Sequence, residues 1–412
     1  MNENINKRAL FYGSCFALIT TAFTFAIRAG ILAQLGREYE LSPTQLGFIN
    51  SMWFLGFPIS MIIGGLVYHS FGAKNIMIVA FVSHTIGIIL TIFSVGPYIY
   101  PLLLISTLFI GFGNGCTEAA CNPMIADSYS GIKMNKMLNR FHMWFPGGIV
   151  LGSLISKFMT DFELGWQSQM WVIMIPTIIY AALFYGKTFP KSQNAEGTSL
   201  AENFKAMSTP IYLFLFFCMA LTAITEFGPQ QWVGLIMSSS GAHPMLILAL
   251  VTGLMAVGRF FAGPVVEKFG QTGVLLTSAV FATLGIFLFS IATGPYVYMA
   301  AICFAIGVCY FWPTMVGAVA QRVPLSGALG MSVIGGIGMF STAIFQPIIG
   351  SWIDRDRAEG LAAGLTGLEL DLVSGQDTLT KMVAFPAILV VLFIILFFWQ
   401  KKTKKDVIAV AH

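Results

Sequence analysis

The feature that most restricts what this chain can fold into is a series of apolar runs of about 20 residues, separated by short polar stretches. A helix of that length crosses the hydrocarbon core of a bilayer and satisfies its own backbone hydrogen bonds. We count twelve such runs and predict an all-α membrane protein with twelve transmembrane helices. The predicted spans are residues 9–35, 45–68, 75–95, 99–123, 141–160, 169–187, 210–236, 244–266, 272–293, 297–320, 327–352 and 381–400.

The composition agrees with this prediction and narrows the classes of function. Charged residues make up 10% of the 412 residues and hydrophobic residues 57%, whereas a soluble chain has about a quarter charged residues. The sequence contains no nucleotide-binding loop, no metal-ligand spacing around its six cysteines and no catalytic Ser/His/Asp set. We therefore expect no enzyme activity, cofactor, metal or nucleic-acid partner. The expected partners of a monomeric protein are the lipid bilayer and a small molecule.

The distribution of basic residues predicts the orientation. With both termini on the cytoplasmic side, fifteen Lys and Arg residues lie inside and five outside, as the positive-inside rule requires. The expected location is therefore the cytoplasmic (inner) membrane. A polar stretch at 187–209 divides the chain into predicted six-helix bundles at 1–186 and 210–412. We expect a second long polar loop, Asp354 to Lys381, on the outer side.

An internal repeat relates the two bundles. Gly-Pro-Tyr-Ile-Tyr at 96–100 recurs as Gly-Pro-Tyr-Val-Tyr at 294–298, which is 198 residues later. The same offset maps Gly65 onto Gly263 and Gly72 onto Gly270. Six spans separate the copies, so both have the same orientation. This arrangement of two six-helix pseudo-repeats resembles the fold of the major facilitator superfamily of transporters.

The loop after span 2 of that superfamily has a Gly-x-x-x-Asp-Arg-x-Gly-Arg/Lys signature. Both halves of this chain resemble it, although His69 and Ser70 stand where the first copy should have Asp and Arg. The resemblance implies a gating latch between helices, and ordinary basic loops are the alternative. The implied gating residues are Gly65, Gly72, Lys74, Arg259, Gly263, Glu267, Lys268 and Gly270.

The clearest functional candidate is Glu118, a carboxylate inside the apolar run from Gly111 to Pro123. A charged side chain at membrane depth is costly and normally faces a bundle interior or a water-filled pathway. Asn114 and Asn122 lie four residues before and after it, so the three polar side chains share one helical face. The alternative is a small-residue packing seam with one satisfied polar contact.

The same stretch resembles span 4 of the fucose permease family of proton-coupled sugar transporters. The likeness rests on Gly113, Gly115, Glu118, Ala120, Asn122 and Pro123. It implies that Glu118 takes part in proton coupling and sugar binding. The chain departs from the family in span 1, where Arg28 stands near the position of the family's carboxylate.

Other polar residues within spans complete the predicted site. Arg28 either faces the cavity, where it binds a carboxylate or pairs with an acidic residue such as Glu226, or extends to the outer interface. Glu226 precedes a helix-breaking Gly-Pro and a cluster of amide and indole groups suited to a sugar. Those groups are Gln230, Gln231 and Trp232, with Trp53, Trp144, Trp312 and Gln346 as weaker cavity candidates.

These patterns together favour a secondary transporter that moves a sugar or sugar-like metabolite by alternating access, as a proton symporter. Glu118, Glu226 and His142 are the candidates for proton coupling. Uptake or exchange of an organic anion such as a sugar acid, bound by Arg28, is the alternative within transport. A nutrient receptor that binds without transporting is the alternative from another class.

Overall fold

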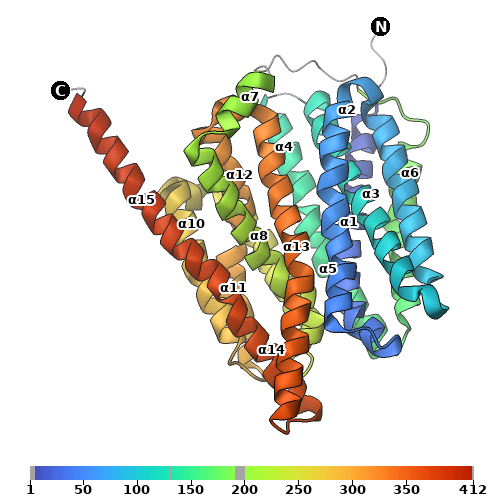
Figure 1. The fold of residues 1–412 in the computed structure, drawn as a ribbon. Coiled ribbons are helices and arrows are strands. Elements are labelled where there is room, and N and C mark those ends of the chain that lie inside the picture. Colours follow the sequence, from blue (N-terminus) through green and yellow to red (C-terminus); the bar gives the residue numbers. More distant parts are fainter. Residues whose placement is uncertain (1–4, 130, 191–199, 411–412) are drawn as a thin grey trace.

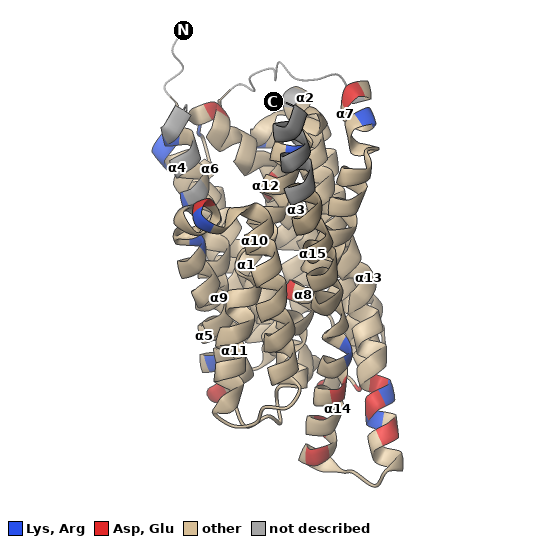
Figure 2. Cartoon of the chain, turned by 90° about the vertical axis from the view of Figure 1, so that its left-hand side faces the viewer, with Lys and Arg blue, Asp and Glu red and all other residues tan. Residues whose placement is uncertain are grey.

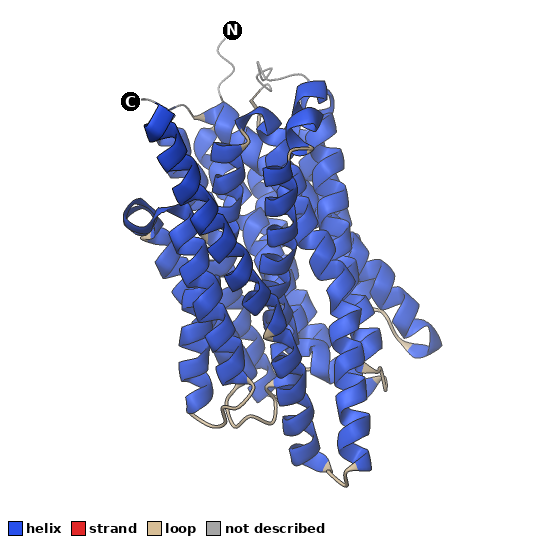
Figure 3. Cartoon of the chain, turned by 60° about the vertical axis from the view of Figure 1, so that its left-hand side comes forward, coloured by secondary structure: helices blue, strands red, loops and turns tan. Residues whose placement is uncertain are grey.

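The computed structural model describes residues 5–129, 131–190 and 200–410, and within these ranges the chain forms helices and no strand (Figure 3). The first half comprises α1 (Lys7–Glu38), α2 (Pro43–Ile92), α3 (Ile99–Ser128), α4 (Gly131–His142), α5 (Trp144–Asp161) and α6 (Trp166–Phe184). The second half comprises α7 (Leu200–Met207), α8 (Pro210–Ile236), α9 (Pro244–Phe260), α10 (Ala262–Phe289), α11 (Tyr296–Val308), α12 (Phe311–Arg322), α13 (Gly327–Ala362), α14 (Gly367–Met382) and α15 (Ala384–Val410). Short 3₁₀ turns at Gly96–Tyr98 and Pro324–Ser326 precede α3 and α13.

These elements make up twelve spans, so the predicted fold class is confirmed. Ten segments of the described chain are long and apolar enough to cross a membrane, and the shorter α5 and α9 complete the set. Helix α2 contains two spans, and both α2 and α10 change direction at a glycine with positive φ. These glycines are Gly72 (φ 77°) and Gly270 (φ 67°), which the 198-residue repeat relates. Charged residues lie mainly towards the two ends of the bundle, and most of its middle is uncharged (Figure 2).

The predicted outer loop between Asp354 and Lys381 is wrong, because most of it is helical. Helix α13 continues to Ala362, and α14 begins only five residues later, at Gly367. The buried Asp356 carboxylate accepts a hydrogen bond from the Thr378 hydroxyl (2.9 Å) and forms an ion pair with Lys381. The polar residues therefore pair between two helices, and polarity alone did not distinguish such a hairpin from a loop.

The two halves of the chain lie beside each other (Figure 1). Helix α1 begins and α15 ends on one side of the molecule, here called the terminal face, and the α13–α14 hairpin projects from the opposite side, the far face. The halves meet through α2 against α13, α5 against α9 and α1 against α8. The predicted bundle boundaries stay a prediction, and residues 191–199 of the predicted linker lie outside the described residues.

The halves are joined most closely towards the far face. A Cβ atom at Gly350 would lie 2.3 Å from the Pro43 carbonyl oxygen, so α13 and α2 touch there through backbone. The Thr44 backbone N–H donates to the Asp354 carboxylate (2.9 Å), which places an acidic group at the N-terminus of α2. These contacts close the far side of the interface.

A second far-face contact joins α5 to the loop before α9. The Nε2 atom of His243 lies 3.5 Å from the Asp161 carboxylate. Burial, and then the nearby Lys157, lower the pKa of the His243 imidazole from its usual 6.5. The ring is therefore mostly neutral at pH 7, and this contact is a weak polar one.

Candidate functional site

Arg28 lies in the interior, at the contact between α1 and α8, and does not extend to the outer interface. Its side chain is buried, with 6% of the residue exposed. Its Nε and Nη2 atoms both donate to the Gln231 side-chain oxygen, at 3.1 and 2.5 Å. The Gln231 amide donates in turn to the Phe25 carbonyl (3.3 Å). The structure thus joins two of the predicted site residues from opposite halves of the chain.

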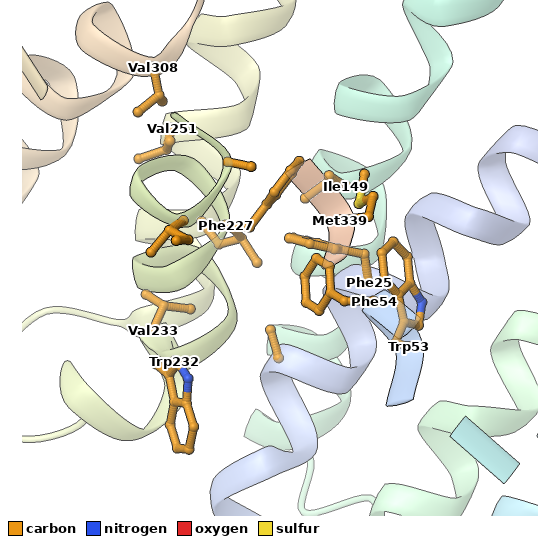
Figure 4. Close-up of a cluster of buried hydrophobic side chains, with 14 of the residues drawn as sticks. Phe25, Trp53, Phe54, Ile149, Phe227, Trp232, Val233, Val251, Val308 and Met339 are labelled. Atoms are coloured by element: carbon orange, nitrogen blue, oxygen red, sulfur yellow. The ribbon is translucent and has the colours of Figure 1, made fainter. Parts of the chain in front are cut away.

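Aromatic rings surround this guanidinium group. The Trp53 ring centre lies 4.9 Å from its central carbon and the Phe54 ring centre 5.7 Å away, which are cation–π distances. Phe227 of α8 contacts the rings of Phe25 (5.9 Å between centres) and Phe54 (5.8 Å), so the cluster crosses the contact between the halves (Figure 4). We call the following set the aromatic layer: Phe25, Trp53, Phe54, Phe227 and Trp312.

Several buried polar atoms near the contact between the halves have no hydrogen-bond partner. They belong to α1, α2, α8 and α13, the helices through which the halves meet. Buried polar groups are nearly always paired, so an unpaired set of this kind requires an explanation such as a ligand or water. At the contact these atoms are Arg28 Nη1 and both amide atoms of Asn50 and of Gln346, and Trp232 Nε1 of α8 is also without a partner.

A second buried polar group, inside the first half, is fully paired. The Tyr180 hydroxyl lies 3.0 Å from Nδ1 of His84, and Nε2 of His84 lies 2.8 Å from the Asn114 side-chain oxygen. The Asn114 amide and the Trp53 indole N–H both donate to the Thr24 hydroxyl, at 3.1 and 3.0 Å. We call these five residues the His84 network.

The partners fix the direction of every hydrogen bond in the His84 network. The Asn114 oxygen can only accept, so His84 carries its proton on Nε2 and its Nδ1 accepts from Tyr180. The Thr24 hydroxyl donates to the Thr21 carbonyl (2.7 Å). Asn114 was expected to contact substrate but is a fully buried member of this network. His84 and Tyr180 were missed, and the only sequence signal for them is a His and a Tyr within apolar runs.

Glu118 lies one helical turn from this network and has a different environment. It is partly exposed, and its carboxylate accepts a hydrogen bond from the Asn122 amide (2.6 Å). The glycines around it pack α3 against α2: a Cβ at Gly111 would lie 2.3 Å from the Trp53 carbonyl oxygen, and one at Gly115 would lie 2.0 Å from that of Phe57. The stretch is thus both a packing seam and the location of an accessible carboxylate.

Glu226 does not pair with Arg28, so the predicted ion pair between these two residues is wrong. Its carboxylate forms an ion pair with Arg259 of α9 (3.2 Å), and its second oxygen has no partner. The Nε atom of Arg259 donates to the Cys309 carbonyl (2.9 Å). That carbonyl is free because Pro313, four residues later, has no N–H to donate. Arg259, which was predicted to belong to the gating latch, bridges α8 to the break between α11 and α12.

The remaining predicted residues have other surroundings. Gln230 faces α9, with its amide 3.8 Å from the Met255 sulfur, and Trp232 is fully buried. His142 is exposed at the end of α4. The latch residues lie towards the terminal face, where Gly65, Lys74, Glu267, Lys268 and Gly270 are exposed.

Two observations limit what else the described residues can hold. They contain no group of three His, Cys, Asp or Glu side chains able to bind a metal. A polar pocket of about 500 Å³ lies at the terminal face, between Ile5–Lys7 and Gly186–Thr188. None of the residues that line it belongs to the aromatic layer.

Comparison with known proteins gives one family and many relatives. The family model for the Major Facilitator Superfamily matches residues 14–332. The hexuronate transporter of Bacillus subtilis is 27% identical over 42% of this chain and 40% of its own length. The gentisate transporter of Corynebacterium glutamicum is 22% identical over 78% of this chain and 77% of its own. The crystal structure of the nucleoside transporter NupG superposes with a TM-score of 0.72 at 14% identity, covering 96% of this chain and 99% of that one.

Proposed function

Because this chain belongs to the Major Facilitator Superfamily, we propose that it is a secondary transporter of a small organic anion, which it moves across the membrane by alternating access. The observation that carries the proposal is the environment of Arg28. Its guanidinium is buried, and the described residues include no acidic partner for it. One of its nitrogens, Nη1, has no hydrogen-bond partner.

Electrostatics explains why this environment favours an anion. A buried cation without a counter-ion is strongly unfavourable, and a substrate carboxylate would supply the missing charge. The planar guanidinium group of arginine also fits the planar carboxylate and donates short, charge-assisted hydrogen bonds to it. The names of the hexuronate and gentisate transporters denote organic anions, which supports the same class for this chain. A small organic carboxylate is the proposed substrate.

Alternating access is supported by the uneven contact between the halves. The far side is closed by backbone contact at Gly350 and by the Thr44–Asp354 hydrogen bond. The predicted latch residues at the terminal face are exposed. This arrangement is the one expected when the substrate path opens towards the terminal face. We propose that the terminal face is cytoplasmic and that the protein is a monomer in the inner membrane.

The experiment that tests the anion proposal is counterflow in proteoliposomes. Labelled carboxylates should enter vesicles preloaded with the same unlabelled compound, and the neutral analogue of each should not compete. Suitable pairs are glucuronate with glucose and benzoate with benzamide. Counterflow of the neutral member alone would contradict the role of Arg28, and binding without exchange would indicate a receptor.

Proton symport of a sugar, as in the fucose permease family, is the second candidate, favoured by the Glu118–Asn122 hydrogen bond at a partly exposed site. In either case we propose Glu118 as the proton carrier. Glu118→Gln retains the size and hydrogen bonding of the protonated acid but cannot release a proton. It should abolish accumulation driven by a pH gradient while exchange persists. Wild-type accumulation by this variant would transfer the role to Glu226 or His142.

The orientation is tested by labelling single cysteines introduced at positions 195 and 365 in intact cells. Position 195, which lies outside the described residues, should react only after the membrane is permeabilised. Position 365, in the turn between α13 and α14, should react from outside. The reverse pattern would place the terminal face outside.

A further inference from the structure

The aromatic layer is built from both halves of the chain. Phe25, Trp53 and Phe54 belong to α1 and α2, whereas Phe227 and Trp312 belong to α8 and α12. Figure 4 shows Phe227 directed across the contact towards Phe25 and Phe54. Alternating access requires the halves to change their relative position, so these ring contacts must be broken and remade during transport.

The guanidinium of Arg28 leaves little choice in how a ligand can approach. Its Nε and Nη2 atoms already donate to Gln231. Trp53 and Phe54 lie within cation–π distance of it. Only Nη1 has no partner, so a carboxylate would bind there, at one edge of the group. The remainder of that ligand must then lie against the aromatic layer.

We propose that the substrate is an aromatic carboxylate whose ring inserts between Phe227 and the rings of the first half while its carboxylate binds Arg28. This inference rests on the proposed transport of an organic anion and specifies its class. A flat aromatic ring replaces the ring contacts that are lost when Phe227 separates from Phe25 and Phe54, because stacked and edge-to-face pairs are mutually favourable.

A polyhydroxylated ring fits this environment less well. Every hydroxyl group that is buried without a partner destabilises the complex, and aromatic carbon offers no strong acceptor. The unpaired amides of Asn50 and Gln346 can serve one or two polar ring substituents, but not a hydroxyl on each carbon. The geometry therefore allows a hydroxylated aromatic acid and disfavours a sugar acid.

The His84 network adds rigidity to one wall of this site. The Trp53 indole donates to Thr24, which Asn114 and His84 hold in turn. A ring whose orientation is already fixed loses little conformational entropy when a ligand stacks on it. Trp53 is thus a preorganised contact surface, and the buried network behind it is a positioning device.

The test is binding of labelled benzoate and labelled glucuronate to the full-length protein in lipid nanodiscs. Cyclohexanecarboxylate, which keeps the charge and approximate size but lacks the aromatic ring, should compete about tenfold more weakly than benzoate. Benzamide, which lacks the charge, should compete more weakly still. Equal competition by cyclohexanecarboxylate and benzoate would overturn the inference, as would tighter binding of glucuronate. Either result would leave transport of an organic anion standing, whereas equal competition by benzamide would remove the anion proposal itself.

Two matched variants locate the effect. Phe227→Leu removes the ring at the contact between the halves but keeps an apolar side chain, and it should reduce the preference for benzoate over cyclohexanecarboxylate to about twofold or less. Phe289→Leu removes a ring from another buried pair, Phe289 with Phe304 (5.8 Å between centres), and should leave the preference unchanged. An unchanged preference in Phe227→Leu, with both variants folded, would show that the ring of the substrate binds elsewhere.

Discussion

The His84 network and the polar atoms at the contact between the halves are both buried in apolar surroundings, yet they differ in one respect. In the network every side chain from Tyr180 to Trp53 has a hydrogen-bond partner. At the contact between the halves, Arg28 Nη1 and the amides of Asn50 and Gln346 have none. The first group forms part of the scaffold, and we propose that the second binds the substrate.

The free energies involved explain the distinction. A buried hydrogen bond contributes about 1 kcal/mol, whereas a buried donor or acceptor without a partner costs about 1–3 kcal/mol. The unpaired set therefore destabilises the protein unless a ligand satisfies it. Mutations should accordingly have opposite effects in the two regions: lost stability in the network, and lost binding with little change in stability at the contact between the halves.

The largest expected effect is that of Arg28→Met on binding. It removes the cation that contacts the aromatic layer and should weaken binding of the carboxylate probe at least about 100-fold, which corresponds to about 2.7 kcal/mol. Thermal stability without substrate should change little, because removing a buried cation that has no counter-ion offsets the loss of its two hydrogen bonds to Gln231. Binding in nanodiscs and a thermal unfolding curve measure the two effects. A large loss of stability with retained binding would reverse the assignment of the two regions.

His84→Ala should show the opposite behaviour. It leaves the Tyr180 hydroxyl and the Asn114 oxygen unpaired and creates a small cavity, so stability should fall by about 2 kcal/mol. The neighbouring Thr85→Ala is the matched control, since its hydroxyl has no partner to lose. Unfolding of both variants in detergent gives the comparison. Equal stabilities would mean that the network contributes nothing to the scaffold.

The Glu226–Arg259 pair lies between these extremes, because one carboxylate oxygen is paired and the other is not. Glu226→Gln and Arg259→Gln should each lower the free energy of unfolding. The loss in the double variant should be about 1 kcal/mol smaller than the sum of the two single losses. Arg28→Met combined with Glu226→Gln should be additive. A double-mutant cycle measures both terms, and coupling between Arg28 and Glu226 would contradict the observed pairing.

The smallest expected effect is that of Gln346→Leu. It replaces a buried amide without partners by an apolar group of similar size, and should raise stability by up to about 1 kcal/mol. Affinity for a hydroxylated aromatic acid should fall, while affinity for benzoate stays unchanged. A destabilised Gln346→Leu protein would show that the amide already has a partner, such as an ordered water.

Much of the fold could be predicted because membrane helices follow local rules. Span length, apolar composition and the 198-residue repeat are properties of the sequence, and the related glycines Gly72 and Gly270 do adopt the same unusual φ. The prediction failed between Asp354 and Lys381, where charges pair across a helical hairpin. Local polarity is the same for a loop and for two helices whose charges meet.

For the candidate site, the apolar runs alone indicate which polar groups lie at membrane depth: Arg28, Glu118, Glu226 and Gln231 stand within such runs, and the cost of burying them made each one a candidate. How these groups pair depends on the packing of the helices and could not be predicted from the runs. Arg28 meets Gln231 across 203 residues of sequence, and Glu226 meets Arg259 instead of Arg28. His84 became part of a network only when α2, α3, α6 and α1 were packed together. The physical reason is that burial is a local cost, readable from one segment, whereas a hydrogen bond requires two groups within about 3 Å, and the packing of separate helices sets that distance.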